Sequence, residues 1–110
     1  MTASEGGSLI LDSRQGTIVG TTPFSQVVQP PARGLLQWAY SLVVQTDPPS
    51  RVTVALRDPT LGQTVAMDRS DDGIASIEAV LAERTYELRI ESEQSLSFQA
   101  ICTETYGYRA

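Results

Sequence analysis

The residues with the clearest capacity for chemistry are carboxylates crowded into one short stretch. Asp68, Asp71 and Asp72 lie within five residues of one another, and Glu78 or Glu83 could fold near them. Paired carboxylates can serve as acid and base in glycoside hydrolysis, and carboxylate oxygens in a loop are ligands that Ca²⁺ prefers. The stretch lacks the alternating pattern and the terminal Glu of an EF-hand loop. The alternative is a solvated hairpin tip in which Asp serves turn geometry alone.

Other catalytic and metal chemistries lack the residues they need. The 110 residues contain no His, and all eight basic residues are Arg, so the usual bases that activate a Ser nucleophile are absent. One Cys without His cannot form a zinc site, and no G-x-x-x-x-G-K phosphate loop is present. We therefore expect that the chain is not an enzyme. The one cofactor that the residues suggest is Ca²⁺, held by Asp68, Asp71 and Asp72.

The single cysteine, Cys102, excludes a disulfide within these 110 residues. It is in phase with Leu96, Phe98 and Ala100 along an alternating stretch, so we expect it on the buried side of a strand. A free Cys there usually acts as a small core hydrophobe.

Charge and hydropathy exclude two classes of partner. The net charge is −5, and all of it comes from residues 56–110, with ten acids and five arginines. Such a chain cannot assemble the basic face that nucleic acid requires. No apolar run approaches the roughly 20 residues that span a bilayer, so we expect no membrane insertion. The first residues show no signal peptide, and the compartment is left open.

The elements that must position these residues read as strands. Apolar and polar residues alternate in several short stretches, and turn residues such as Asp47-Pro-Pro-Ser and Asp58-Pro-Thr-Leu-Gly separate them. This pattern predicts an all-β fold, an antiparallel β-sandwich or jelly roll of about seven to nine short strands. We expect one domain over residues 9–110, preceded by an N-terminal arm of residues 1–8.

Several strands can be placed individually. We expect two short strands, Leu9–Asp12 and Thr17–Gly20, on either side of a turn-like Ser13–Gly16. Residues 35–46 form the longest candidate, with Leu36, Trp38 and Tyr40 on its apolar side. The final strand is expected to span residues 95–105.

Residues 74–83 are ambiguous between strand and helix. Ile74, Ile77 and Leu81 fit a helical spacing, whereas alternation through Ala75, Ile77 and Ala79 fits a strand equally well. The preceding Asp72-Gly73 is a hairpin signal, so a strand is the favoured interpretation.

Part of the chain resembles a known family. The matching residues are Val54-x-Leu56-x-Asp58, Gly62-x-x-Val65-Ala66, the Asp71-Asp72-Gly73 turn, and Leu81 followed by Thr85-Tyr86-x-Leu88-x-Ile90. Over roughly residues 38–101 the sequence is similar to the bacterial pre-peptidase C-terminal domain, although Arg84 stands where that family usually has Gly. The resemblance implies a jelly-roll sandwich that serves as an accessory module of exported proteases.

The C-terminal residues are candidates for protein contact. Tyr106 and Tyr108 alternate around Gly107 beyond the last clear strand, with Arg109 beside them, and tyrosine and arginine are enriched at interfaces. Packing on an edge strand is the alternative. We also expect the N-terminal arm to dock on a neighbouring subunit or partner.

Three functions follow from these observations. The first is a non-catalytic binding or accessory module that contacts a protein or a glycan. The second is a structural assembly subunit, such as a virion decoration or capsid-associated protein, with a protein partner or a homo-oligomer as its context. The third is a small carboxylate-based hydrolase.

Overall fold

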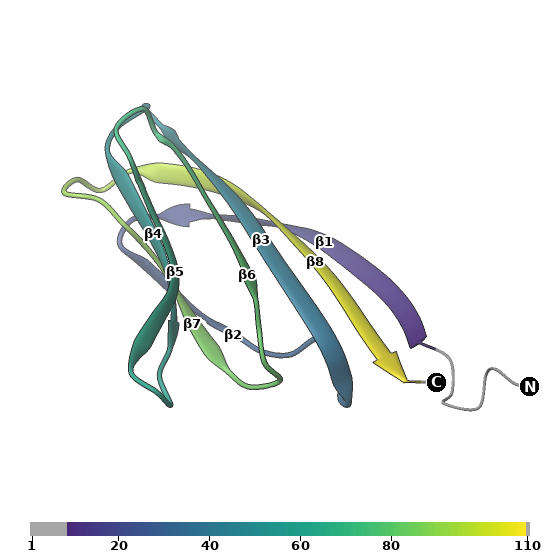
Figure 1. The fold of residues 1–110 in the computed structure, drawn as a ribbon. Helices are drawn as coiled ribbons and strands as arrows, with labels where there is room; N and C mark the ends of the chain where they lie inside the picture. The colour runs from purple at the N-terminus through teal and green to yellow at the C-terminus, as the bar shows by residue number, and fades with distance from the viewer. Residues whose placement is uncertain (1–8, 110) are drawn as a thin grey trace, which may run out of the picture.

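The structure is a computed structural model, and it describes residues 9–109, so the expected N-terminal arm of residues 1–8 lies outside the described residues. These residues form eight strands and no helix (Figure 1). The strands are β1 (Leu9–Thr21), β2 (Phe24–Val28), β3 (Leu35–Asp47), β4 (Val52–Asp58), β5 (Gln63–Ser70), β6 (Ile74–Val80), β7 (Tyr86–Glu91) and β8 (Ser97–Arg109). No described segment is a helix of the length and apolarity that crossing a membrane requires.

The strands form two four-stranded sheets, in which every neighbouring pair is antiparallel. Sheet A has the order β1-β8-β3-β6, and sheet B has the order β2-β7-β4-β5. Apart from β4 and β5, strands that follow one another along the chain lie in different sheets. The predicted antiparallel β-sandwich is thus confirmed. In Figure 1, β1, β3 and β8 run on past the ends of the sheet B strands, toward the C-terminus.

The core lies between the sheets and follows the predicted alternation. Because successive side chains of a strand point to opposite faces, the alternate residues of β3, β4 and β7 all reach the interior. The largest apolar side chains that are fully buried are Trp38, Leu42, Leu56, Leu88 and Ile90. Trp38 and Tyr86 meet edge to face across the two sheets, with ring centroids 5.8 Å apart. Burial of apolar surface is therefore what holds the sheets together.

The expectation of two short N-terminal strands was wrong. Residues 9–21 form one continuous strand, β1, which pairs with β8 at every position without a register shift. The turn-like Ser13–Gly16 stays extended because the β8 ladder continues beside it. Arg14 also reaches across this ladder to Glu104, whose carboxylate accepts a hydrogen bond from its Nε at 2.9 Å.

Two further expectations on the long strands need correction. β8 does not end near Thr105 but continues to Arg109, because β1 and β3 flank it to its last residues. Leu36 is exposed, not buried with Trp38 and Tyr40. The register of β3 against β8 shifts between Leu35 and Gln37, and this bulge changes the alternation before Trp38.

The ambiguous segment is a strand, as favoured, over Ile74–Val80, and residues 81–83 belong to the loop that follows it. β6 buries Ala75 and Ile77 and exposes Ile74 and Val80. Its start is fixed by Gly73, whose φ is +84°. An added Cβ there would lie 2.6 Å from the hydroxyl of Thr46, so only Gly fits this turn.

An ion pair with one buried partner ties the end of β4 to the loop before β7, at one end of sheet B. Asp58 is fully buried, and its Oδ1 accepts hydrogen bonds from the backbone N–H groups of Thr60 and Leu61. Its Oδ2 lies 2.8 Å from Nε of Arg84 in the loop before β7. Asp58 therefore stabilises the predicted turn, and Arg84 supplies the charge that allows the carboxylate to be buried.

Candidate interaction surface

The acidic turn connects β5 of sheet B with β6 of sheet A, and its three aspartates make separate contacts. Asp71 lies 2.8 Å from Nε of Arg51, at the surface. Asp68 accepts the backbone N–H of Ser76 at 2.9 Å. Asp72 accepts the hydroxyl of Ser70 and the backbone N–H of Ile74, and these bonds hold the pKa of the Asp72 carboxyl below its usual range.

Within residues 9–109 no three His, Cys, Asp or Glu side chains are arranged to share a metal ion. Glu83 is engaged elsewhere, where its Oε1 accepts the backbone N–H of Leu35 at 2.8 Å, and Glu78 lies on β6 opposite Ser41. The contacts of the aspartates are those of a turn that crosses from one sheet to the other, and not of the hairpin that Asp72-Gly73 suggested, because β5 and β6 lie in different sheets. Calcium binding by Asp68, Asp71 and Asp72 stays a prediction.

The three C-terminal candidates divide between the two faces of sheet A. Tyr106 and Tyr108 lie on the core-facing side of β8, with their rings stacked and their centroids 6.4 Å apart. Arg109 follows on the opposite, outward side and is exposed. The tyrosines are half-buried because Trp38 and Leu35 lie opposite them on β3. They form part of the sheet rather than a separate tail, and a role in protein contact stays a prediction.

A buried polar cluster on the inner side of β8 was missed in the sequence. Glu104 is buried, and its two oxygens accept hydrogen bonds from Nε of Arg14 at 2.9 Å and Nε1 of Trp38 at 2.8 Å. Burial raises the pKa of the neighbouring Tyr40 hydroxyl and Cys102 thiol. The signal was the alternation itself, which places Glu104 in phase with Cys102. The carboxylate is fully satisfied, so the cluster stabilises sheet A.

The outward side of sheet A is nearly free of charge, and we call it the neutral face. Strand registers and alternation place a common set of side chains on it. They are Leu9, Leu11, Ser13, Gln15, Thr17, Val19 and Thr21 of β1, Gln37, Ala39, Ser41, Val43 and Gln45 of β3, Ile74, Ser76 and Val80 of β6, and Ser97, Gln99, Ile101, Thr103 and Thr105 of β8. Among residues 9–109, only Asp47, Glu78 and Arg109 bring charge to this side, two of them at strand ends and one on the edge strand.

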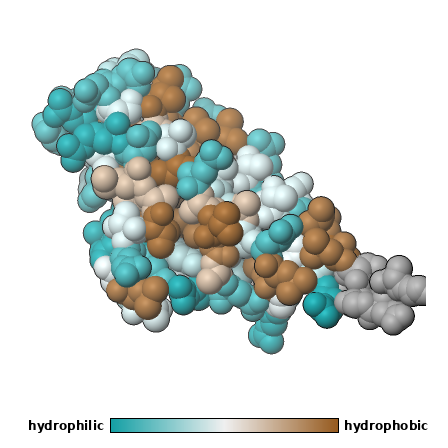
Figure 2. Space-filling view, viewed as in Figure 1, coloured by the Kyte–Doolittle hydropathy of each residue, from teal (hydrophilic) through white to brown (hydrophobic). Residues whose placement is uncertain are grey.

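Apolar side chains are exposed over the neutral face. Val43 and Ile101 lie opposite each other at its centre, 45% and 44% exposed, and Val19 reaches 74%. Figure 2 shows apolar patches distributed along the molecule, whereas hydrophilic side chains gather at the end opposite the chain termini. The exposed apolar side chains of this face thus lie among uncharged polar ones.

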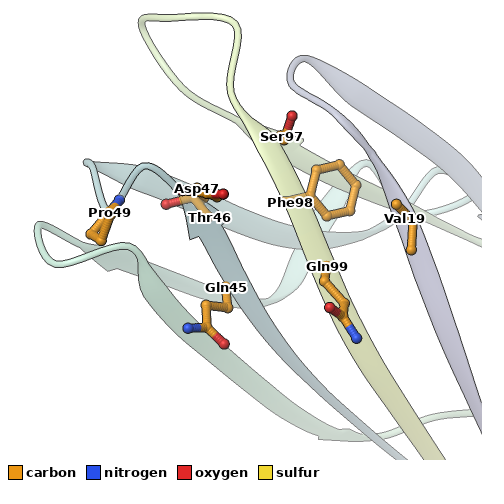
Figure 3. Close-up of a pocket in the computed structure, with 8 residues that line it drawn as sticks. All are labelled: Val19, Gln45, Thr46, Asp47, Pro49, Ser97, Phe98 and Gln99. Atoms are coloured by element: carbon orange, nitrogen blue, oxygen red, sulfur yellow. The ribbon is translucent and has the colours of Figure 1, made fainter.

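The neutral face is hollowed on both sides of its central apolar pair. A hollow of about 430 Å³ lies toward the end of β3, with Val19, Gln45 and Gln99 on three adjacent strands (Figure 3). A second hollow, of about 420 Å³, is lined by Ala39 and Val80 among other residues. The surface thus alternates projections and depressions, as the contact face of a packed sheet does.

Comparison with known proteins gives a fold neighbour. No family model and no curated protein matches the sequence, so the resemblance to the pre-peptidase C-terminal domain is unconfirmed. A solved structure described under "Bacillus endospore appendages form a novel family of disulfide-linked pili" superposes with a TM-score of 0.66. The match covers 98% of this chain and 97% of that chain at 12% sequence identity. At this identity the likeness establishes a shared all-β fold over the whole of both chains.

Proposed function

We propose that this chain is a non-catalytic structural subunit that assembles with further copies of itself. The observation that carries the proposal is the neutral face, a side of the sandwich whose exposed side chains are apolar or uncharged apart from three at strand ends or on the edge strand. Interface cores are depleted of charged residues. Removing Ser, Thr and Gln from water also costs less than removing an unpaired charge. The face therefore has the composition of a surface that becomes covered.

The fold neighbour supports an assembly role, because the description of that structure concerns pili. The same description calls those pili disulfide-linked, and here the present chain differs. Cys102 is the only cysteine in the 110 residues, so these residues can join subunits by disulfides only in pairs. It also lies on the core-facing side of β8, half-buried. Contacts between copies are accordingly noncovalent in this proposal.

A binding module is the second candidate function. It is favoured by the hollow beside Val19, because about 430 Å³ lies in the range of ligand pockets. In that case the occupant is a side chain or glycan unit of another molecule, and the free protein is a monomer at every concentration.

The test compares charge insertion on the two outward faces. Ile101→Glu places an unpaired carboxylate at the centre of the neutral face, and Met67→Glu places one on the outward face of sheet B, where Met67 is 62% exposed. We expect light scattering and sedimentation to show self-association of the parent chain and of Met67→Glu. Ile101→Glu should weaken it at least about tenfold, since burying an unpaired charge is costly.

Salt provides a second arm of the same experiment. Most of the face is uncharged, so the interface should keep most of its strength in 1 M NaCl, because screening acts only on the few charged contacts at its margins. A parent chain that is monomeric at all concentrations would exclude self-assembly and favour the binding module. Equal weakening by the two glutamate substitutions would place the contact elsewhere than on the neutral face.

A further inference from the structure

The two ends of the neutral face differ in shape. At one end Leu9 and Leu11 of β1 project outward, 51% and 62% exposed. At the other end lies the hollow lined by Val19, Gln45 and Gln99 (Figure 3). The same face therefore carries a projection and a depression at opposite ends of its strands.

The projecting end is shaped by a glycine. Gly107 of β8 lies between Leu11 of β1 and Gln37 of β3. A Cβ on Gly107 would lie 3.1 Å from Cδ2 of Leu11 and 3.1 Å from Cγ of Gln37. Because Gly107 has no side chain, these two neighbours close over β8 on the outward side. Leu11 is thus part of the neutral face and is not directed into the core.

The hollow and the projection are symmetric about the middle of the face. Leu11 and Val19 stand four residues on either side of Gln15, and Gln15 pairs with Thr103 at the centre of β8. Four residues of antiparallel strand span about 14 Å. A two-fold axis that crosses the strands at Gln15 and Thr103 therefore brings Leu11 of one copy over Val19 of the other, and does so twice.

We propose that two copies pack neutral face to neutral face, with their strands running in opposite directions and Leu11 of each copy seated in the hollow beside Val19 of the other. This arrangement rests on the proposed self-assembly and specifies its geometry. It is an isologous contact, in which the same patch is used on both copies.

Of the three charged side chains of the face, the two at strand ends favour reversed strands. Glu78 of the edge strand β6 pairs with Ser41 opposite Thr103, so it lies level with the axis and meets its own copy at the margin of the contact. Asp47 ends β3 at the hollow, and Arg109 ends β8 near the projection. Reversal brings Asp47 of one copy toward Arg109 of the other at both ends. Strands running in the same direction would instead bring Asp47 toward Asp47 and Arg109 toward Arg109, which like-charge repulsion disfavours.

The area is sufficient for a stable pair. Four strands spaced about 4.8 Å apart, three of them about 44 Å long and one about 24 Å long at 3.4 Å per residue, present about 750 Å². Stable interfaces bury about 800 Å² on each partner. The neutral face therefore matches the size at which two copies associate specifically.

The arrangement can be tested by thiol crosslinking between copies. Facing sheets lie about 10 Å apart, wider than a disulfide allows, so the probe is a short bis-methanethiosulfonate crosslinker. Leu11→Cys and Val19→Cys chains are treated separately and as an equimolar mixture, with the parent chain and its native Cys102 as the blank. Met67→Cys on sheet B is the matched control, since its side chain is exposed to the same extent as that of Leu11.

The expected product is a crosslinked dimer from the mixture, at least about tenfold more than from either variant alone, and none from Met67→Cys. Gln15→Cys alone should also crosslink, because Gln15 lies on the axis. Crosslinking of Leu11→Cys with itself at the level of the mixture would overturn the reversed arrangement. The reversed arrangement would also be overturned if the mixture stayed uncrosslinked while light scattering showed the same chains to be dimers. Self-assembly would still stand in that case. Monomers by light scattering would defeat self-assembly itself.

Discussion

The outward faces of the two sheets rest on the same antiparallel backbone and differ in what they present to solvent. The neutral face of sheet A carries Thr, Ser, Gln, Val and Ile over most of its area. The outward face of sheet B, here the charged face, carries a dense group of ions from three neighbouring strands, namely Arg57, Arg69, Glu87, Arg89 and Glu91. Arg89 and Glu87 pair at 3.0 Å within it.

The difference shows that solvent exposure alone does not decide the character of a surface. Charge on an exposed sheet keeps chains apart and favours the hydrated state, and the charged face follows that rule. The neutral face does not follow this rule, because most of its exposed side chains are uncharged. We interpret the first as a surface that stays in water and the second as a surface adapted for contact between proteins.

The largest expected effect is on stability. It tests whether the core-facing sides of the two sheets contribute equally to stability, although their outward sides differ in charge. Leu42 of β3 and Leu88 of β7 are both fully buried, one in each sheet. Leu42→Ala and Leu88→Ala should each lower the free energy of unfolding by about 2–5 kcal/mol, as measured by urea denaturation of chains held monomeric by Ile101→Glu. If only one of the two substitutions lowered the free energy of unfolding, the two sheets would not share one core.

A second prediction concerns the thiol on the inner side of sheet A. Burial raises the pKa of Cys102 above its ordinary value, so the folded protein holds less thiolate at pH 8 than the unfolded chain does. Labelling of Cys102 by a thiol reagent should therefore be slower in native than in denatured protein, and should accelerate as the pH rises toward the raised pKa. Equal rates in the two states would show that the thiol is freely accessible.

The same thiol sharpens the contrast between the faces. If copies associate through the neutral face, a reducing agent should leave the solution mass unchanged, because Cys102 points to the opposite side of β8. Loss of association on reduction would indicate a disulfide between copies. The contact would then not lie on the neutral face.

The smallest expected effect lies on the charged face. The double substitution Glu87→Gln/Arg89→Gln removes a partly exposed ion pair, and such pairs contribute about 0–1 kcal/mol. The midpoint of urea unfolding should change little, and self-association should stay within about threefold of the parent value, as judged by sedimentation. A marked loss of association would show that the contact between copies involves the charged face of sheet B and not the neutral face of sheet A.

The sequence predicts those features of the structure that depend on residues near one another in the chain, and it misses those that depend on distant strands. The inward positions Val52, Val54 and Leu56 were predictable, because alternation reports directly which side of a strand avoids water. The continuity of β1 was not, since Ser13–Gly16 has turn-like composition and is held extended by β8, about 90 residues away in sequence. The exposure of Leu36 was hidden as well, because it depends on a register shift between strands.

The neutral face was equally hidden, although each of its side chains stands at an outward position of a predicted strand. Thr17, Val43 and Ile101 become neighbours only when β1, β3 and β8 are placed side by side. Sequence patterns give the side of a strand to which a residue points, but not which strands are adjacent. The acidic turn, by contrast, attracts attention in the sequence because its residues are contiguous, and the structure gives them separate partners.

The pairing of Leu9 with Arg109 at one end of the β1–β8 ladder has a mechanical consequence. The hydrogen bonds of an antiparallel pair run across the strands, and both chain ends leave this ladder at the same end. A force that pulls the two ends apart would separate the paired residues of β1 and β8 one after another from that end. It would not load all thirteen pairs at the same time. Tension transmitted through the ends would peel β1 from the sandwich at low force, whereas tension transmitted across the neutral face would load all four strands of sheet A at once.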